Sequence, residues 1–216
     1  MRKFLFLVVI LVFVFPLQSQ ILFNWSTFDW TWIEEQIDQI DKTHFREATW
    51  GMTQAQIKAL EKDKVKGEGP TEDGMQYLAY EGKAGSLDCL VGYYFVNDQL
   101  LEGRYIFTET HANRTLFLAD FRTVKTALTQ KYGKPTEDEI YWIDDLYQDD
   151  PSDWGMAVAI GHLVFETCWD TPQTGVRLQL RGDNYKLKHA LVYNSKSRRH
   201  QDLKKEAQEK AKKGIW

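Results

Sequence analysis

The chain of 216 residues is 43% hydrophobic and 27% charged, a balance typical of a globular protein with one domain or two small ones. Its formal net charge of −4 is unevenly distributed, since residues 1–19 and 196–216 are basic and the body between them is strongly acidic. An acidic body repels phosphate backbones, which argues against a nucleic-acid-binding protein.

The N-terminus has the pattern of an export signal. Arg2 and Lys3 precede an unbroken apolar run over residues 4–15, and a short polar segment follows. This order predicts a signal peptide at residues 1–19 and an exported protein, periplasmic or extracellular. In the alternative, the segment is retained, anchors the chain in the inner membrane and provides its membrane contact. No Cys follows the apolar run directly, so a lipid-modified N-terminus is not expected.

Residues 20–48 form an aromatic and acidic lead-in. Isoleucines recur at helical spacing between residues 33 and 40, among acidic residues, which predicts a short amphipathic helix. The cluster of Trp25, Trp30 and Trp32 suits either a carbohydrate or membrane-surface platform or a segment packed on the main domain. We favour the second interpretation.

Residues 50–57 read WGMTQAQI, which predicts the start of a helix. Thr53 and Gln56 have the spacing of a capping box, in which Thr53 accepts from the Gln56 amide and Gln56 reaches back to Thr53. Met52 and Ile57 occupy the two positions of a hydrophobic staple. The stretch is therefore interpreted as a device for starting a helix.

The triplet WGM recurs after an acidic stretch, in a different setting. Residues 150–153 resemble a helix start with Pro151 at the first position. Trp154 and Val158 would share one face of that helix, although residues 154–161 are also compatible with a strand. Because one triplet precedes a helix and the other lies inside one, the triplet predicts no tandem repeat.

The next segments predict a loop, a strand and a β-hairpin. The charged segment 62–74 contains glycines and a proline, which is typical of a loop. Residues 75–81 read as a strand. Apolar residues then alternate over 87–95, and Asn97-Asp98 turns the chain into the second strand of the hairpin, which ends near residue 108.

Residues 113–132 are predicted to form the longest helix. Its expected buried positions follow a +4, +3, +4 rhythm and are Phe117, Phe121, Val124 and Leu128. A glycine and a proline stop it directly afterwards. We expect this helix to lie across a sheet, because an apolar stripe of this kind is stable only when buried against another element.

The whole pattern predicts an α+β fold class, an antiparallel sheet with the long helix (residues 113–132) packed on one face and short N-terminal helices. Further strands are expected at residues 140–143, 163–169, 175–180 and 185–193, with an acidic loop at residues 144–153. Residues 49–195 are assigned to a single domain. Residues 196–216 form a basic polar tail, expected to be a solvated helix without a stable docking face.

The sequence shows no constellation typical of catalysis, of a cofactor or of a metal, so no catalytic, cofactor-binding or metal-binding residue is assigned. The five His lack metal-binding spacing, and the motifs of serine hydrolases and nucleotide-binding loops do not occur. Glu109 and His111 suit an acid/base pair with a partner from the acidic loop, but they equally fit the lead-in to the long helix. The acidic loop suits Ca²⁺ or plain solvation, and we favour solvation.

Four further residues carry expectations. His189 alternates with leucines and is expected to point inward with a hydrogen-bond partner, whereas His44 is expected to be an exposed linker residue. The pairing of Cys89 with Cys168 stays open, because outside the cytoplasm they can form a disulfide, and buried free thiols also occur often.

Gly51-Met52-Thr53 with Gln56-Ile57, followed by a three-stranded meander up to about residue 108, resembles the SmpA/BamE family of envelope proteins. The same unit is similar to the β-lactamase-inhibitory-protein family, which repeats it. The order of WGMT, YGKP and a GDN turn also resembles other exported bacterial proteins. The resemblance implies an envelope location and a small helix-on-sheet fold, and it implies no catalytic residue, because these relatives act by binding.

These observations favour a non-enzymatic binding or assembly module of the bacterial envelope, with a protein or another envelope component as its partner. An exposed sheet face or edge would be the contact surface. The alternatives are a secreted hydrolase that uses Glu109 and His111, and an inhibitor of another secreted enzyme. The hydrolase requires Glu109, His111 and the acidic loop to meet in one cavity.

Overall fold

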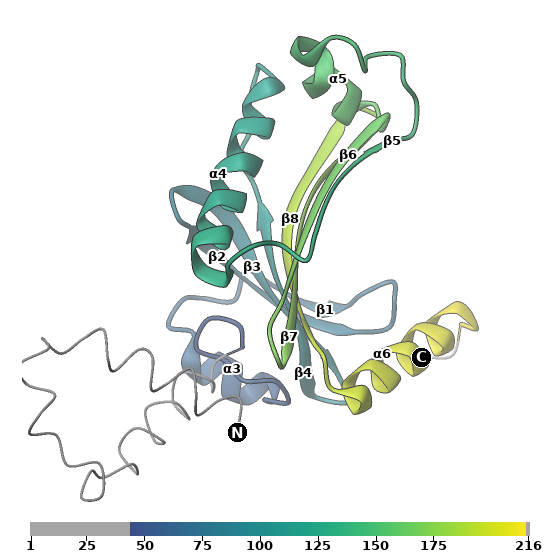
Figure 1. The fold of residues 1–216 in the computed structure, drawn as a ribbon. Coiled ribbons are helices and arrows are strands. Elements are labelled where there is room, and N and C mark those ends of the chain that lie inside the picture. Colours follow the sequence, from purple (N-terminus) through teal and green to yellow (C-terminus); the bar gives the residue numbers. More distant parts are fainter. Residues whose placement is uncertain (1–43, 215–216) are drawn as a thin grey trace, which may run out of the picture. The chain divides into compact units, whose positions relative to one another are not determined.

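The computed structural model describes residues 44–214, and the predicted signal peptide and most of the lead-in, including Trp25, Trp30 and Trp32, lie outside the described residues. The described part contains one eight-stranded antiparallel sheet in the order β1-β2-β3-β4-β8-β7-β6-β5, together with four α-helices (Figure 1). The predicted α+β class and antiparallel sheet are therefore confirmed.

The sheet consists of two four-stranded meanders joined where β4 pairs with β8. The first meander contains β1 (Gly67–Pro70), β2 (Gln76–Ala84), β3 (Leu87–Val96) and β4 (Gln99–Phe107). The second contains β5 (Glu137–Trp142), β6 (Leu163–Asp170), β7 (Thr174–Asp183) and β8 (Lys186–Ser195). The loop prediction for residues 62–74 is wrong at β1, because this segment pairs through its backbone with β2 and its glycines give no apolar alternation.

The helices are α3 (Gln54–Leu60), α4 (Thr115–Tyr132), α5 (Trp154–Ala159) and α6 (Arg198–Lys212). The predicted capping box of Thr53 and Gln56 is present at the start of α3, and Ile57 is buried. Residues 154–159 are helical, which settles the choice left open there, and a short 3-10 turn containing Pro151 precedes them. One WGM thus precedes α3 and the other begins α5, so the two triplets occupy different positions, as expected.

One face of the sheet carries the main core. Alternate residues of β3, from Cys89 to Phe95, are buried there, as predicted. The buried residues of α4 are Leu118, Phe121, Val124 and Leu128. Phe117, which was expected to be buried, is only partly so, because it lies in the first turn of the helix and packs edge-on against His111. Leu118 takes its place in the core.

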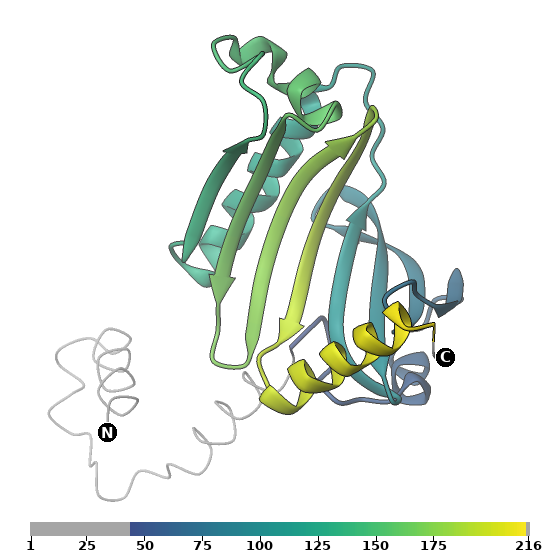
Figure 2. The same ribbon diagram turned by 90° about the vertical axis from the view of Figure 1, so that its right-hand side faces the viewer.

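The opposite face carries α6, and Figures 1 and 2 show α4 and α6 on different sides of the sheet. Ala207 and Leu203 pack against residues of β2, β3 and β4. Lys204 pairs with the buried Glu102 of β4. Gly74 allows close approach, since a Cβ there would lie 2.6 Å from the carbonyl oxygen of Ala207. The expectation of a tail helix without a docking face is therefore wrong.

Although α6 is polar overall, it docks on the sheet through a narrow apolar stripe and one charged contact. Its apolar stripe consists of two positions spaced by four residues, which cover one narrow line of the helix. A charged contact and a glycine on the sheet side complete the interface.

Among residues 44–214 no helix has the length and apolar character needed to cross a membrane.

Candidate functional site

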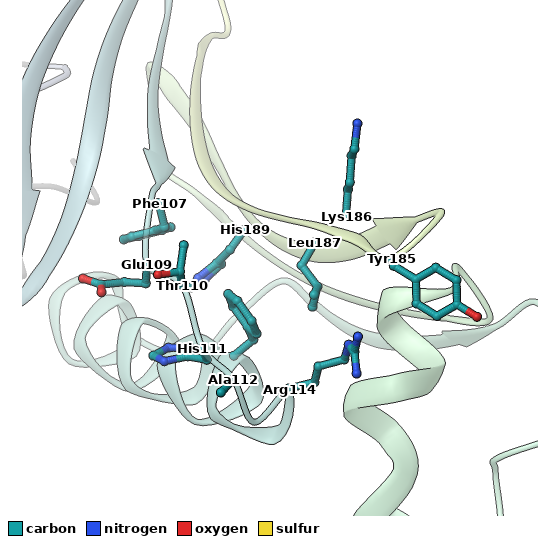
Figure 3. A pocket seen from close by; sticks show the side chains of 11 residues that line it. Phe107, Glu109, Thr110, His111, Ala112, Arg114, Tyr185, Lys186, Leu187 and His189 are labelled. Carbon is teal, nitrogen blue, oxygen red and sulfur yellow. The ribbon is translucent and has the colours of Figure 1, made fainter.

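A cavity opens where β4 and β8 separate. Their last paired residues are Ile106 and Ala190. Beyond this point the chain is drawn toward β3, because the Thr108 amide donates to the Asp88 carbonyl at 3.0 Å and the Asp88 amide donates to the Glu109 carboxylate at 2.7 Å. The space left between the diverging strands and α4 is a cavity of about 380 Å³ (Figure 3).

Both acid/base candidates line this cavity, and each has a structural partner. Glu109 accepts the hydrogen bond from the Asp88 amide, so its carboxylate ties the end of β4 to β3. The Nε2 atom of His111 lies 2.6 Å from the Asp120 carboxylate, and its ring packs edge-on against Phe117. Both contacts fasten the segment before α4, which agrees with the interpretation of Glu109 and His111 as part of the lead-in to the long helix.

The acidic partner expected for a hydrolase is not brought to the cavity. The described residues that line it come from the end of β4, the segment before α4, the first turn of α4 and the start of β8. Asp144 instead lies 3.4 Å from His162, and Asp150 caps the 3-10 turn. Across residues 44–214 no group of three or more His, Cys, Asp or Glu is arranged to hold a metal ion.

His189 is the cavity residue whose importance sequence reasoning missed. It points inward as predicted and is only 5% exposed, and its ring stacks on Phe107. The predicted hydrogen bond is wrong for Nε2, because this atom is buried and has no partner among the described residues. Burial lowers the pKa of His189 to about 4, with partial opposition from the Asp120 carboxylate, so the ring is neutral at neutral pH. The sequence signal that could have indicated this cavity residue was a histidine at an inward position of a strand, a few residues after a turn.

His44 is not an exposed linker residue. Its Nδ1 atom accepts from the Trp50 amide at 2.9 Å, and the two rings stack with centroids 5.6 Å apart. The Trp50 indole donates to the Thr174 hydroxyl at 3.0 Å. This small cluster fastens the segment before α3 to β7, so its role is structural. The expectation failed because His44 also contacts Gln173, 129 residues further along the chain, which no local pattern indicates.

Cys89 and Cys168 are both free thiols. They lie on β3 and β6, which are separated in the sheet by β4, β8 and β7. Four strand spacings correspond to about 19 Å, far beyond disulfide geometry. Burial raises the pKa of both thiols to about 11, which leaves them protonated and unreactive at neutral pH.

The free edge of β5, separated from the cavity by β7 and β6, carries exposed apolar residues. Ile140 and Tyr141 of β5 are exposed, and the following loop adds Ile143, 72% exposed, and Leu146, 69% exposed. The Ile143 amide donates to the His162 carbonyl at 2.7 Å, so the backbone groups of Ile143 face the β6 side. By the alternation of antiparallel ladders, Ile140 and Trp142 direct their backbone groups to the free side.

Comparison of the chain with models of protein families, with curated proteins and with solved structures gave no match.

Proposed function

We propose that this protein is a non-enzymatic binding or assembly module of the bacterial envelope, exported by its N-terminal segment, and that it holds its partner at the free edge of β5. The observation that carries the proposal is the combination of unpaired backbone groups and exposed apolar side chains along one edge strand. Exposed edges of this kind accept an added strand from another chain.

The charge of this edge selects the partner. Residues 137–153 contain eight acidic residues and no Lys or Arg. Within the described chain, Lys125 pairs with Asp138, and Glu137 and Glu139 have no ion pair. An extended segment that alternates basic and apolar residues complements this edge in both backbone and charge.

A second copy of the chain is a poor occupant of the same edge. Two copies of β5 would bring together two segments that each carry Glu137, Asp138 and Glu139 and no basic residue, and like charges brought together across an interface are unfavourable. The resemblance to envelope binding proteins supports the same choice of a foreign partner.

The proposal gives α4 a supporting role, as a long helix packed on one face of the sheet behind β5. Lys125 of α4 reaches Asp138 of β5 at 2.6 Å, and Phe121 packs against Phe165 of β6. These contacts hold β5 in a fixed position while its outer side stays free. A rigid edge avoids the cost of ordering on binding.

The test is a titration with a short peptide of alternating lysine and valine, followed by NMR of the backbone amides. We expect saturable binding with shifts centred on Ile140 and Trp142. Ile140→Pro removes the outward amide, whereas the matched variant Ile140→Ala keeps this amide and removes only the side chain. Pairing at the edge requires the proline variant to lose binding while the alanine variant retains most of it.

Three outcomes contradict the proposal: equal binding by both variants, shifts confined to another surface, or equal binding of a peptide of alternating glutamate and valine. Circular dichroism of both variants shows whether the sheet is intact. The hydrolase alternative gains no support from the geometry, because its acidic partner is not at the cavity.

A further inference from the structure

We propose that the cavity between β4 and β8 binds a small organic acid with an apolar body and a polar group at its far end. This site is separate from the β5 edge and does not depend on the proposed function. The argument has four parts: an unpartnered buried group, apolar walls, a cationic rim and a strained residue at the entrance.

The base of the cavity presents a polar atom that nothing satisfies. His189 Nε2 is buried and has no hydrogen-bond partner in the described chain, although buried polar atoms are normally paired. Figure 3 shows this ring directed from β8 toward the segment that carries Thr110. A ligand hydroxyl placed beside Thr110 supplies the missing hydrogen bond.

The walls and volume suit a small ligand. Phe107, Phe117 and Leu187 provide apolar surface, and about 380 Å³ lies within the usual range for small-molecule sites. The cavity is therefore lined as such sites usually are, with an apolar body and a few polar groups that fix orientation.

The rim is cationic. Arg114 lines the cavity and forms no salt bridge within residues 44–214, whereas the Lys186 side chain is directed away from the cavity (Figure 3). The carboxylate of Glu109 is directed to the Asp88 amide, and the Asp120 carboxylate is engaged by His111. The unpaired Arg114 guanidinium at the entrance favours an anionic group on the ligand, because a guanidinium binds a carboxylate with two parallel hydrogen bonds.

Tyr185 at the same rim has a conformation that its side chain disfavours. It lies in the two-residue turn between β7 and β8 with φ of +65°, next to Asn184 with φ of +47°. Glycine is the preferred residue at this turn position. The tyrosine is nevertheless present, 60% exposed, with the Arg114 guanidinium 5.8 Å from its ring centre. A strained aromatic residue that gains little burial is typical of a ligand contact.

The test uses 3-(4-hydroxyphenyl)propanoate, 3-phenylpropanoate and the neutral amide of each, titrated into the full-length chain and followed by NMR of imidazole and backbone signals. We expect the hydroxylated acid to bind saturably, with shifts of His189 and Tyr185. Removing its hydroxyl or neutralising its carboxylate should each weaken binding about tenfold, or 1.4 kcal/mol.

Variants connect each ligand group to its residue. Arg114→Gln should weaken both acids about tenfold and leave the amides unchanged. In His189→Phe the difference between hydroxylated and plain acid should disappear. Arg177→Gln, an exposed change on β7 outside the cavity, is the matched control and should bind as the wild type does.

The proposal is overturned if neither acid binds saturably at millimolar concentration, if the amides bind as well as the acids, or if Arg114→Gln behaves like Arg177→Gln. Amide spectra of every variant report whether the fold is retained. Tyr185→Gly provides a second test, because it relieves the backbone strain of the turn and should still weaken the binding of both acids.

Discussion

The imidazole of His189 lies nearly parallel to the ring of Phe107, with centroids 4.1 Å apart and planes inclined by 26°. The contact joins β8 to β4 just beyond their last paired residues. A phenylalanine in place of His189 would keep the stacking without an unpaired nitrogen. Stability alone therefore does not explain a histidine at this position. Its lowered pKa makes the free energy of unfolding depend on pH.

The free energy of unfolding should fall between neutral pH and pH 4 because of His189. An unfolded His has a pKa near 6.5, and the folded value is about 4, so the unfolded state binds the proton first as pH falls. The contribution is fully present above about 6.5, declines toward 4 and amounts to about 3 kcal/mol. Urea unfolding of the wild type and His189→Phe at both pH values measures it, and parallel pH profiles would contradict the assignment.

Replacing Tyr185 by glycine should stabilise the protein by about 1 kcal/mol, since the turn position has positive φ and glycine adopts it without strain. The measurement is the thermal midpoint by calorimetry. Tyr185→Ala is the control, because alanine loses the ring and keeps the strain. A midpoint for the glycine variant at or below that of the alanine variant would show that the turn is not strained.

Phe121→Asp should destabilise the protein by about 4 kcal/mol, because it places a charge in the core without a cation to pair with. Phe121 packs against Phe165 and His189 from the buried side of α4. Thr126→Asp, on the exposed side of the same helix, should change stability by less than about 1 kcal/mol. Denaturant unfolding of both variants gives the comparison, and similar losses in the two would exclude a buried face at Phe121.

Gly182→Ala should cost about 3 kcal/mol or prevent folding, because the added Cβ would lie 2.1 Å from the Val158 carbonyl oxygen of α5. The clash is with backbone, which a rotamer change cannot relieve. Gly175→Ala on the same strand meets only the Asp170 side chain at 3.6 Å and should be tolerated. Thermal unfolding of the pair measures the contact between α5 and β7, and equal midpoints would argue against it.

Local signals in the sequence predicted several elements well. The capping box at Thr53, the alternation in β3 and the stop after α4 each depend on residues near one another in the chain. Such signals survive in any fold that uses the element. The prediction of an antiparallel α+β arrangement followed from the turns that connect neighbouring strands.

The features that escaped prediction depend on contacts between distant residues. The edge strand β1 is defined by its backbone pairing with β2, and the α6 interface combines Lys204 with Glu102, which lies 102 residues earlier in the chain. The cavity forms because β4 leaves β8 after Ile106, which no local pattern indicates. Glu109 and His111 line the same cavity, and their partners Asp88 and Asp120 follow from the fold and not from the local sequence.

The pairing of β4 with β8 means that the sheet can be completed only late in synthesis. β4 is complete at Phe107, and roughly 80 residues must follow before β8 begins. Until then the newly made first meander carries a long unpaired edge, the kind of surface that recruits other chains. Lys204, the partner of the buried Glu102, arrives later still. A chain truncated before Lys186 therefore lacks the strand that pairs with β4, and the edge of β4 becomes covered only when the C-terminal segment has been made.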